Sequence, residues 1–344
     1  MPEKSALLHV TKAALLSGLD NALKNYAIAA LTNAKGAPQY DYITKAQEID
    51  FRYTQTVLSP KKFFFPTEED LLEYQTDGKI ATKIATNPTV LFGIHPCDLH
   101  GIKILDEAFA DGNGDPNYLA KRENTLIIGL DCKAVCDKHA FCYRVAAQEA
   151  PEGFDVMLYF ADTNDFLIKI GTPRGEDFVK TYLTTASAAA DAWEKYRHAK
   201  KQNFANCAPF KKLDKFPEIF AQNEDHAFWQ KEGSRCLSCG SCIMVCPTCY
   251  CFDVTDELEL NLAKGARTRK WDACMLSDFA VVAGGENFRH SATERLKHRI
   301  NRKFNYLMSK HGRSVCVGCG RCVRACLADI SPKTIAETIA DDKE

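Results

Sequence analysis

The stretch 236–247 reads Cys-Leu-Ser-Cys-Gly-Ser-Cys-Ile-Met-Val-Cys-Pro, and its cysteine spacing recurs at 316–326, which reads Cys-Val-Gly-Cys-Gly-Arg-Cys-Val-Arg-Ala-Cys. A triple of cysteines with two residues in each gap, followed by a fourth cysteine, is the ligand pattern of a [4Fe–4S] cluster. The two copies therefore predict two such clusters. Zinc modules use pairs of cysteines rather than a triple plus a fourth, so a zinc site is the weaker alternative.

The fourth cysteine of each run is expected to serve the other cluster. This crossed ligation is the rule in two-cluster ferredoxins. We therefore predict two ligand sets, a first set of Cys236, Cys239, Cys242 and Cys326, and a second set of Cys316, Cys319, Cys322 and Cys246.

Length and composition limit the class of protein. A chain of 344 residues is long enough for two domains. Its 44 Lys and Arg nearly balance 45 Asp and Glu, so a net charge of −1 predicts neither a nucleic-acid partner nor a membrane surface. No secretory signal pattern opens the chain, and no apolar run approaches the ~20 residues that span a bilayer. We expect a cytoplasmic protein whose sixteen cysteines are mainly metal ligands rather than disulfides.

The cysteines divide the chain into two predicted domains. Residues 1–225 hold five cysteines and read as a mixed α/β domain, whereas residues 226–344 hold the other eleven. The 69 residues between the two motifs, 247–315, are predicted to be largely helical, with a capping box at Ser291 and Glu294 and a helix stop at Gly312. The fold class is therefore α+β, an α/β domain followed by an α-helical, ferredoxin-like domain.

Hydrophobic patterns locate the elements of the first domain. Buried strands are predicted at 89–94 and 125–130, the first followed by a turn and a helix through residue 109. A hairpin is predicted from 156–160 and 166–170 around a turn at 162–165. A capping-box pattern at 67–70 predicts a short helix, and residues 178 to about 200 predict a long, Ala-rich helix.

Four cysteines of the first domain are candidates for a third [4Fe–4S] cluster. Cys97 and Cys132 each follow the carboxyl end of a predicted strand, where ligands gather in open α/β sheets, and Cys136 and Cys142 lie shortly after Cys132. Cys97 also begins a helix, whose dipole favours a thiolate. The alternative is that these cysteines are packing residues, because cysteine is among the most buried residue types.

Three further cysteines, Cys249, Cys251 and Cys274, lie in the second domain outside both ligand sets. They are one thiolate short of a full ligand set. They could hold another centre together with an outside ligand, or donate weak S–H contacts to a neighbouring cluster; ordinary packing is the competing interpretation.

The second domain is locally basic. Residues 264–324 contain fourteen Lys and Arg against four Asp and Glu. Such a stretch is often a solvated helix face. Alternatively, the cations could balance the negative charge of thiolate-bound clusters, or dock an acidic partner subunit. No RNA-binding signature accompanies the charge.

Other catalytic signatures are missing from the sequence. There is no phosphate-binding glycine loop and no nucleotide-binding fingerprint, although a flavin site stays open. No nucleophile and base stand out as a pair, so the prediction names no catalytic residue and expects a non-catalytic subunit.

The chain resembles the beta subunits of hydrogenase/sulfur reductases (sulfhydrogenases) and is similar to an iron–sulfur subunit of anaerobic sulfite reductase. The resemblance covers most of the chain and rests on segments 64–71, 96–99, 236–251, 271–275, 283–289 and 316–322. The cluster motifs alone occur in many redox proteins. The elements Pro-Thr-Cys-Tyr-Cys at 247–251 and Trp-Asp-Ala-Cys-Met at 271–275 make it more specific.

The resemblance implies an iron–sulfur subunit that relays electrons within a multi-subunit oxidoreductase. One partner would handle NAD(P)H through a flavin, and the other would carry a terminal catalyst of the hydrogenase, sulfur reductase or sulfite reductase type. A second hypothesis gives the N-terminal domain its own substrate or flavin site, supplied with electrons by the clusters. A third is a structural zinc protein.

Overall fold

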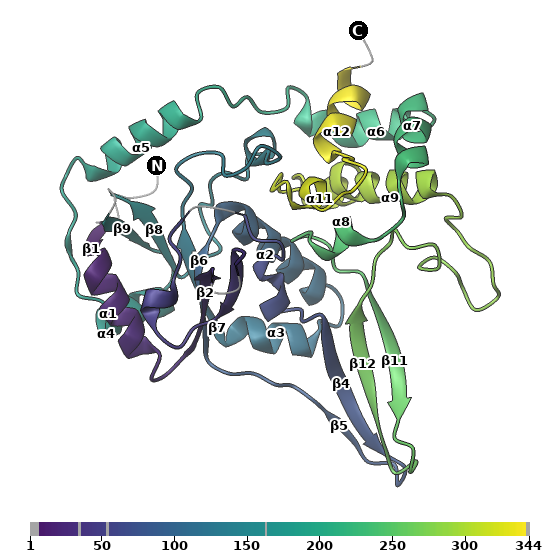
Figure 1. Ribbon diagram of the computed structural model, residues 1–344, viewed down its shortest axis with the longest axis horizontal. Helices are drawn as coiled ribbons and strands as arrows, with labels where there is room; N and C mark the ends of the chain where they lie inside the picture. The colour runs from purple at the N-terminus through teal and green to yellow at the C-terminus, as the bar shows by residue number, and fades with distance from the viewer. Residues whose placement is uncertain (1–6, 34–35, 53–54, 162–163, 342–344) are drawn as a thin grey trace.

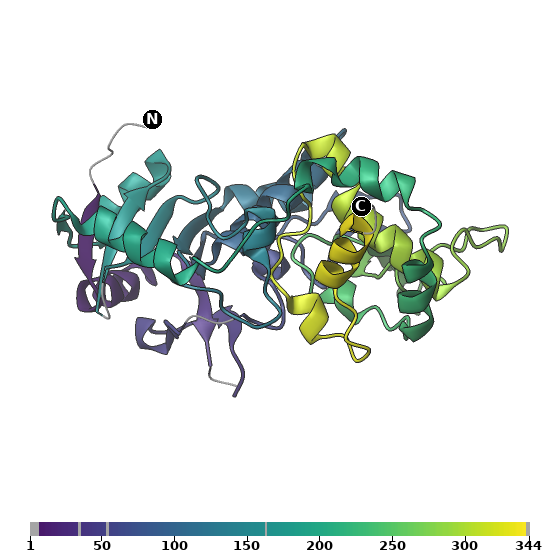
Figure 2. The same cartoon turned by 90° about the horizontal axis from the view of Figure 1, so that it is seen from above.

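The computed structural model describes residues 7–33, 36–52, 55–161 and 164–341. Two β-sheets and a group of helices form two lobes that lie side by side (Figures 1 and 2). This combination confirms the predicted α+β class. In the part of the chain that is described, no helix is long and apolar enough to cross a bilayer.

The N-terminal lobe is built on a sheet that has eight strands within the described ranges, in the order β10–β1–β9–β8–β7–β6–β2–β3. The strands are β1 (Leu8–Thr11), β2 (Ala27–Thr32), β3 (Gln39–Tyr42), β6 (Thr89–Ile94), β7 (Thr125–Leu130), β8 (Val156–Phe160), β9 (Asp165–Ile170) and β10 (Ala186–Ser187). The central strands β2, β6, β7 and β8 are parallel, and the outer pairings are antiparallel. The predicted strands β6 and β7 and the β8–β9 hairpin are confirmed; residues 162–163 of its turn lie outside the described ranges.

Helices cover both faces of this sheet because β6 and β7 are buried along their whole length. Alternate side chains of a strand point to opposite faces. Val90 and Phe92 of β6 therefore pack with α1 (Lys12–Ala22) and α4 (Pro173–Tyr182), while Leu91 packs with α2 (Pro96–Ala110) and α3 (Pro116–Glu123). One-turn 3₁₀ helices are η1 (Ala46–Glu48), η2 (Pro60–Phe63), η3 (Cys142–Val145) and η4 (Leu213–Lys215).

The predicted long helix from 178 to about 200 is wrong. Helix α4 ends at Tyr182, strand β10 follows, and a second helix, α5, spans Ala192–Asn203. Strand β10 pairs with β1 at the edge of the sheet. The backbone groups of an edge strand need partners, and this long-range pairing outweighs the local helix propensity.

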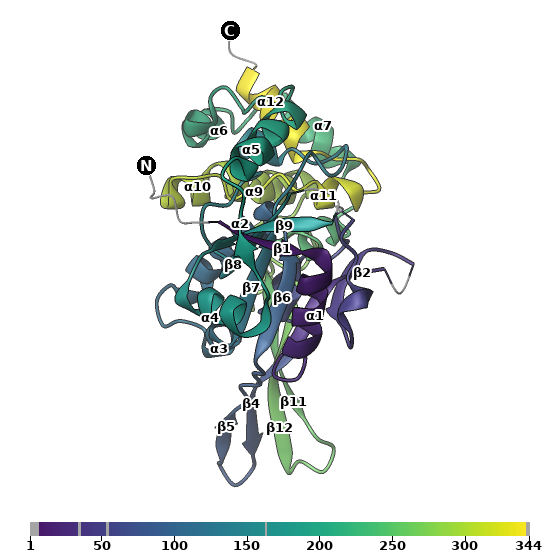
Figure 3. The same cartoon turned by 90° about the vertical axis from the view of Figure 1, so that its left-hand side faces the viewer.

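A second, antiparallel sheet projects from the two lobes as an arm (Figures 1 and 3). Its order is β11–β12–β4–β5, from β4 (Glu68–Gln75), β5 (Ile80–Thr82), β11 (Phe252–Leu258) and β12 (Lys264–Trp271). The helix predicted at 67–70 is therefore wrong, because β4 pairs with β12 from the other half of the chain. The insert between the motifs likewise begins with the β11–β12 hairpin rather than with helices.

The C-terminal lobe is a group of short helices. They are α6 (Phe216–Gln222), α7 (Ala227–Arg235), α8 (Ser241–Met244), α9 (Ala292–Phe304), α10 (Tyr306–His311), α11 (Arg321–Arg324) and α12 (Pro332–Asp341). The capping box of Ser291 and Glu294 begins α9 as predicted, and Gly312 ends α10 with a positive φ. The core of this lobe also contains Cys97 and Phe141 of the first 225 residues. The predicted boundary at 225 stays a prediction, since packing continues across it.

A buried arginine anchors the arm to the N-terminal lobe. Arg269 on β12 is almost completely buried and forms ion pairs with Glu69 on β4 and Asp115 at the start of α3. Its guanidinium also lies over the ring of Phe65. Two carboxylates of the first part of the chain therefore depend on one cation of the second.

We predict that Arg269→Ala lowers the free energy of unfolding by about 3–5 kcal/mol, because it leaves two carboxylates without their shared partner. The matched control is Arg267→Ala, two residues away on β12, whose ion pair with Asp256 is about half exposed. Surface pairs contribute little, so the control should unfold almost like the wild type. Anaerobic denaturant titration measures both variants, and equal effects would contradict the prediction.

Candidate metal centres

The two cysteine loops share one backbone conformation. In the first loop Ser238 and Gly240 have positive φ angles of 52° and 74°, and in the second loop Gly318 and Gly320 have 62° and 79°. These residues occupy the same places between the cysteines, where the chain must curl tightly. Each loop then enters a one-turn helix, α8 or α11. The repeat seen in the sequence is thus a repeat of local structure.

The structure brings together the four cysteines of the first set. Cys236, Cys239, Cys242 and Cys326 line one small cavity between the first loop and the segment before α12. Leu296 and Arg299 of α9 close its inner side. Cys239 is exposed, so this cavity lies near the surface.

The second set lines a separate cavity, formed by Cys246, Cys316, Cys319 and Cys322. This cavity lies deeper, against Phe141 of the N-terminal lobe and Pro332 of α12. Within the described ranges, no three His, Cys, Asp or Glu side chains are close enough together to hold a single metal ion. The zinc hypothesis therefore has no preformed site there.

Helix α9 supplies cations to both cavities. Arg295, Arg299 and Lys303 follow one another at intervals of four residues, which places them on one side of the helix, and all three are buried. Arg299 lines both cavities, and Lys303 lines the second. Part of the basic stretch is therefore an interior feature and not a solvated helix face.

Burial controls the protonation of the thiols. It raises the pKa of Cys242 to about 11 and that of Cys316 to about 12, while Arg299 opposes the shift at Cys242 and Lys303 opposes it at Cys316. Iron binds the thiolate, so ligation at these positions must displace a proton. The buried cations favour the charged form that iron requires.

A buried ion pair joins the second loop to the N-terminal lobe. Arg321, between Cys319 and Cys322, donates from Nη1 and Nη2 to the carboxylate of Asp98 on α2, at 2.5 and 2.8 Å. Its Nε donates to the Thr56 carbonyl at 2.9 Å. Both charged side chains are almost fully buried. The pair fixes the second cavity beside the helix that carries Cys97.

The four N-terminal candidate cysteines lie in this same region. Cys97 is in the first turn of α2, and the side chain of Gln55 donates to its Sγ at 3.6 Å and also bonds Cys136. Cys142 begins η3, and burial raises its pKa to about 12, with a further contribution from the negative charge of Cys136. Cys132 follows β7, near Tyr40, whose pKa is raised by burial and by several charges that include Cys97 and Cys132.

Loop 139–142 is packed directly on the second cysteine loop. The backbone N–H of Phe141 donates to the Gly318 carbonyl at 2.6 Å. A Cβ at Gly318 would lie 2.6 Å from the backbone of Phe141 and Cys142, and one at Gly320 would lie 2.6 Å from His139. These glycines therefore permit both a left-handed turn and a close approach between the lobes.

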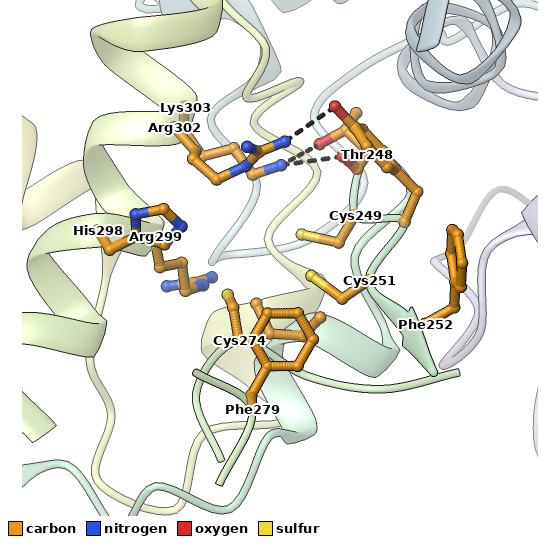
Figure 4. A pocket seen from close by; sticks show the side chains of 12 residues that line it. Thr248, Cys249, Cys251, Phe252, Cys274, Phe279, His298, Arg299, Arg302 and Lys303 are labelled. Carbon is orange, nitrogen blue, oxygen red and sulfur yellow. Dashed lines mark hydrogen bonds between the residues drawn. The ribbon is translucent and has the colours of Figure 1, made fainter. Parts of the chain in front are cut away.

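Cys249, Cys251 and Cys274 line a third cavity, which is shown in Figure 4. Cys249 hydrogen-bonds Cys246 of the second set, and Cys251 hydrogen-bonds Cys274. The Nζ of Lys61, a buried side chain, donates to the Cys249 carbonyl at 2.9 Å, and burial lowers its pKa to about 8.

Sequence reasoning missed the residues that connect these sites. Arg299, Gln55 and the pair of Asp98 and Arg321 were not singled out. For Arg299 a signal exists, because basic residues at 295, 299 and 303 recur with helical spacing on the side of Leu296 and Ile300. Partners of Arg321 and contacts of Gln55 depend on distant segments and carry no local signal.

We predict that Gly318→Ala destabilises the protein more than Gly312→Ala. Both glycines have a positive φ, which costs alanine about 1–2 kcal/mol. Nothing lies within 4 Å of a Cβ at Gly312, whereas one at Gly318 would overlap the backbone of Phe141, adding about 1–3 kcal/mol. Anaerobic thermal unfolding of both variants tests this. Equal melting temperatures would argue against the contact between loop and lobe.

Comparison with known proteins agrees with this geometry. Residues 235–330 match the family model described as a 4Fe-4S dicluster domain, a range that includes all eight cysteines of the two sets. Over 308 residues the chain is 33% identical to sulfhydrogenase 2 subunit beta of Pyrococcus furiosus, and the alignment covers 88% of this chain and 89% of that relative. The chain belongs to the family of sulfhydrogenase beta subunits, and it carries a 4Fe-4S dicluster domain.

Proposed function

We propose that this iron–sulfur electron-transfer subunit holds two [4Fe–4S] clusters, one on each four-cysteine set. The observation that carries the proposal is that each set lines its own cavity while Arg299 lines both. When bound, such clusters accept and donate single electrons. We assign the C-terminal lobe to the α-helical ferredoxin type, because short helices surround both loops.

The side chains of the lobe would hold and tune the two centres. Arg299 and Lys303 offset the negative charge of the thiolates, which favours the reduced, more negative state. Apolar neighbours such as Leu296 and Phe141 limit water access. The exposed Cys239 makes the first set the natural point of electron exchange with another protein, and the second set leads inward.

We further propose a third [4Fe–4S] cluster at Cys97, Cys132, Cys136 and Cys142. Its support is that Gln55 contacts both Cys97 and Cys136, that Cys142 lies within electrostatic range of both, and that Cys97 interacts with Cys319 of the second set. This centre would extend the relay into the N-terminal lobe.

The proposed partners are other subunits of a redox complex. Because the relative in Pyrococcus furiosus is a subunit of a sulfhydrogenase, we place this chain between a flavin subunit that handles NAD(P)H and a terminal catalyst of the hydrogenase, sulfur reductase or sulfite reductase type. The isolated chain would then be reduced reversibly and would not turn over substrate.

One observation favours the second hypothesis, a substrate or flavin site in the N-terminal lobe. A crevice of about 1110 Å³ lies between α5 and the rest of this lobe, lined by Trp193, Tyr159 and Lys200. Lys200 donates to buried Asp131 at 2.7 Å. A bound chromophore in anaerobically purified protein, or substrate-dependent reoxidation of the isolated chain, would support this alternative.

Crossed ligation predicts a non-additive pattern of iron loss. Cys239→Ala with Cys326→Ala removes two ligands of one cluster, so the double variant should lose about four iron and four sulfide per chain, no more than either single variant. Cys239→Ala with Cys246→Ala touches both clusters and should lose about eight of each. Iron and acid-labile sulfide are measured after anaerobic purification. The reverse pattern would mean that each run binds its own cluster.

The third cluster has its own test. Cys136→Ala should lose about four iron per chain while the spectra of the two C-terminal clusters persist. Cys207→Ala is the matched variant, because Cys207 also lies in the N-terminal lobe near Cys142 but outside the proposed ligand set. Full iron content is expected for Cys207→Ala. Loss of iron from that variant alone would show that the ligand set is wrong, and loss from neither would remove Cys136 as a ligand.

A further inference from the structure

The cavity of Cys249, Cys251 and Cys274 is a site that neither four-cysteine set uses. It measures about 280 Å³ and lies beneath α9. Figure 4 shows the three sulfur atoms facing a common space, with Arg299 and His298 on its opposite side. Phe279 closes one side, and Phe252 at its edge is 40% exposed, so the cavity is reachable from solvent.

The fold brings these thiols together from two segments. Cys249 and Cys251 follow the last cysteine of the first run, and Cys274 follows strand β12. At the base of the β11–β12 hairpin, Phe252 pairs with Trp271, and the N–H of Asp272 donates to the Cys251 carbonyl at 3.0 Å. The hairpin register thereby sets Cys251 beside Cys274, to which its thiol is hydrogen-bonded.

The charge around the cavity calls for an anion. Arg299, Arg302 and Lys303 line it, and among the described residues around it there is no carboxylate. Lys303 donates from Nζ to Thr248 Oγ1 at 2.7 Å, and Arg302 from Nη2 to the Tyr250 hydroxyl at 2.8 Å. Arg299 is only 4% exposed, and its Nε has no hydrogen-bond partner within the described protein. A buried cation with an unused donor indicates a negatively charged occupant.

We propose that this cavity binds an additional [4Fe–4S] cluster through Cys249, Cys251 and Cys274, with a small anion or water on the fourth iron. Three thiolates and the bound core make a net negative group, which the three cations of α9 would balance. A disulfide between Cys251 and Cys274 would leave Cys249 and the cations without a counterpart. A single zinc ion is disfavoured, because the described residues offer no preformed group of three ligands for one ion.

The position of this centre connects it to the second set. Thr248, Arg299 and Lys303 line both cavities, and Cys249 is hydrogen-bonded to Cys246. The additional centre is therefore a branch of the relay that ends at a solvent-accessible iron without a thiolate. The assignment rests on the proposed function only in taking Cys246 as a ligand of the second set.

The test compares wild type, the double variant Cys251→Ala with Cys274→Ala, and Cys207→Ala as a cysteine control, all purified anaerobically. We expect the double variant to contain about four fewer iron and four fewer sulfide per chain than the wild type and the control. Iron that lacks a thiolate is the most easily lost, so mild oxidation with ferricyanide should give a [3Fe–4S] signal in the electron paramagnetic resonance spectrum of the wild type and not of the double variant.

The outcomes are separable. Equal iron and sulfide in the double variant and wild type would overturn the proposal, as would a protected Cys251–Cys274 disulfide found by thiol alkylation and mass spectrometry. Signals of the remaining clusters report whether the double variant folds; where they are lost, the wild-type spectrum after oxidation decides, and a missing [3Fe–4S] signal overturns the proposal. Failure of the main proposal would appear instead as unchanged iron in the variants of Cys239, Cys246 and Cys326.

Discussion

The buried guanidinium of Arg299 is the interaction on which the arrangement of the C-terminal lobe depends. It lines all three cysteine cavities of the lobe. Thiolates cannot accumulate in an apolar interior unless cations offset their charge. Helix α9 meets this need because basic residues four positions apart lie on its inner side, among the apolar residues that fill the core.

The two lobes are held together around the second cysteine set. The buried pair of Arg321 and Asp98 crosses from α11 to α2, and loop 139–142 lies on the glycines of the second cysteine loop. On the opposite side, Arg269 joins the arm to α3. Charges buried in pairs tolerate little displacement, so these contacts fix the distance between the N-terminal cysteines and the second set.

Under the proposed ligation the centres form an ordered series. The first set is nearest the surface, the second set lies at the contact of the lobes, and two further groups of cysteines flank it, one in the N-terminal lobe and one beneath α9. A buried centre with neighbours on several sides suits a relay, whereas the exposed positions suit exchange with partner proteins. The crevice beside α5 lies in the N-terminal lobe, so it does not interrupt this series.

The sequence alone determined the two cysteine runs, the crossed pairing hypothesis, the central strands and the family, because these depend on spacing within short segments. It misjudged 67–70 and 178–200, where pairing with β12 and with β1 decides the structure. Only the tertiary structure placed Cys274 beside Cys251 and Asp98 against Arg321, which lie 23 and 223 residues apart. Contacts between distant segments leave no periodic trace in the chain, so residue type and local spacing could name the candidate ligands but not the groups that surround them.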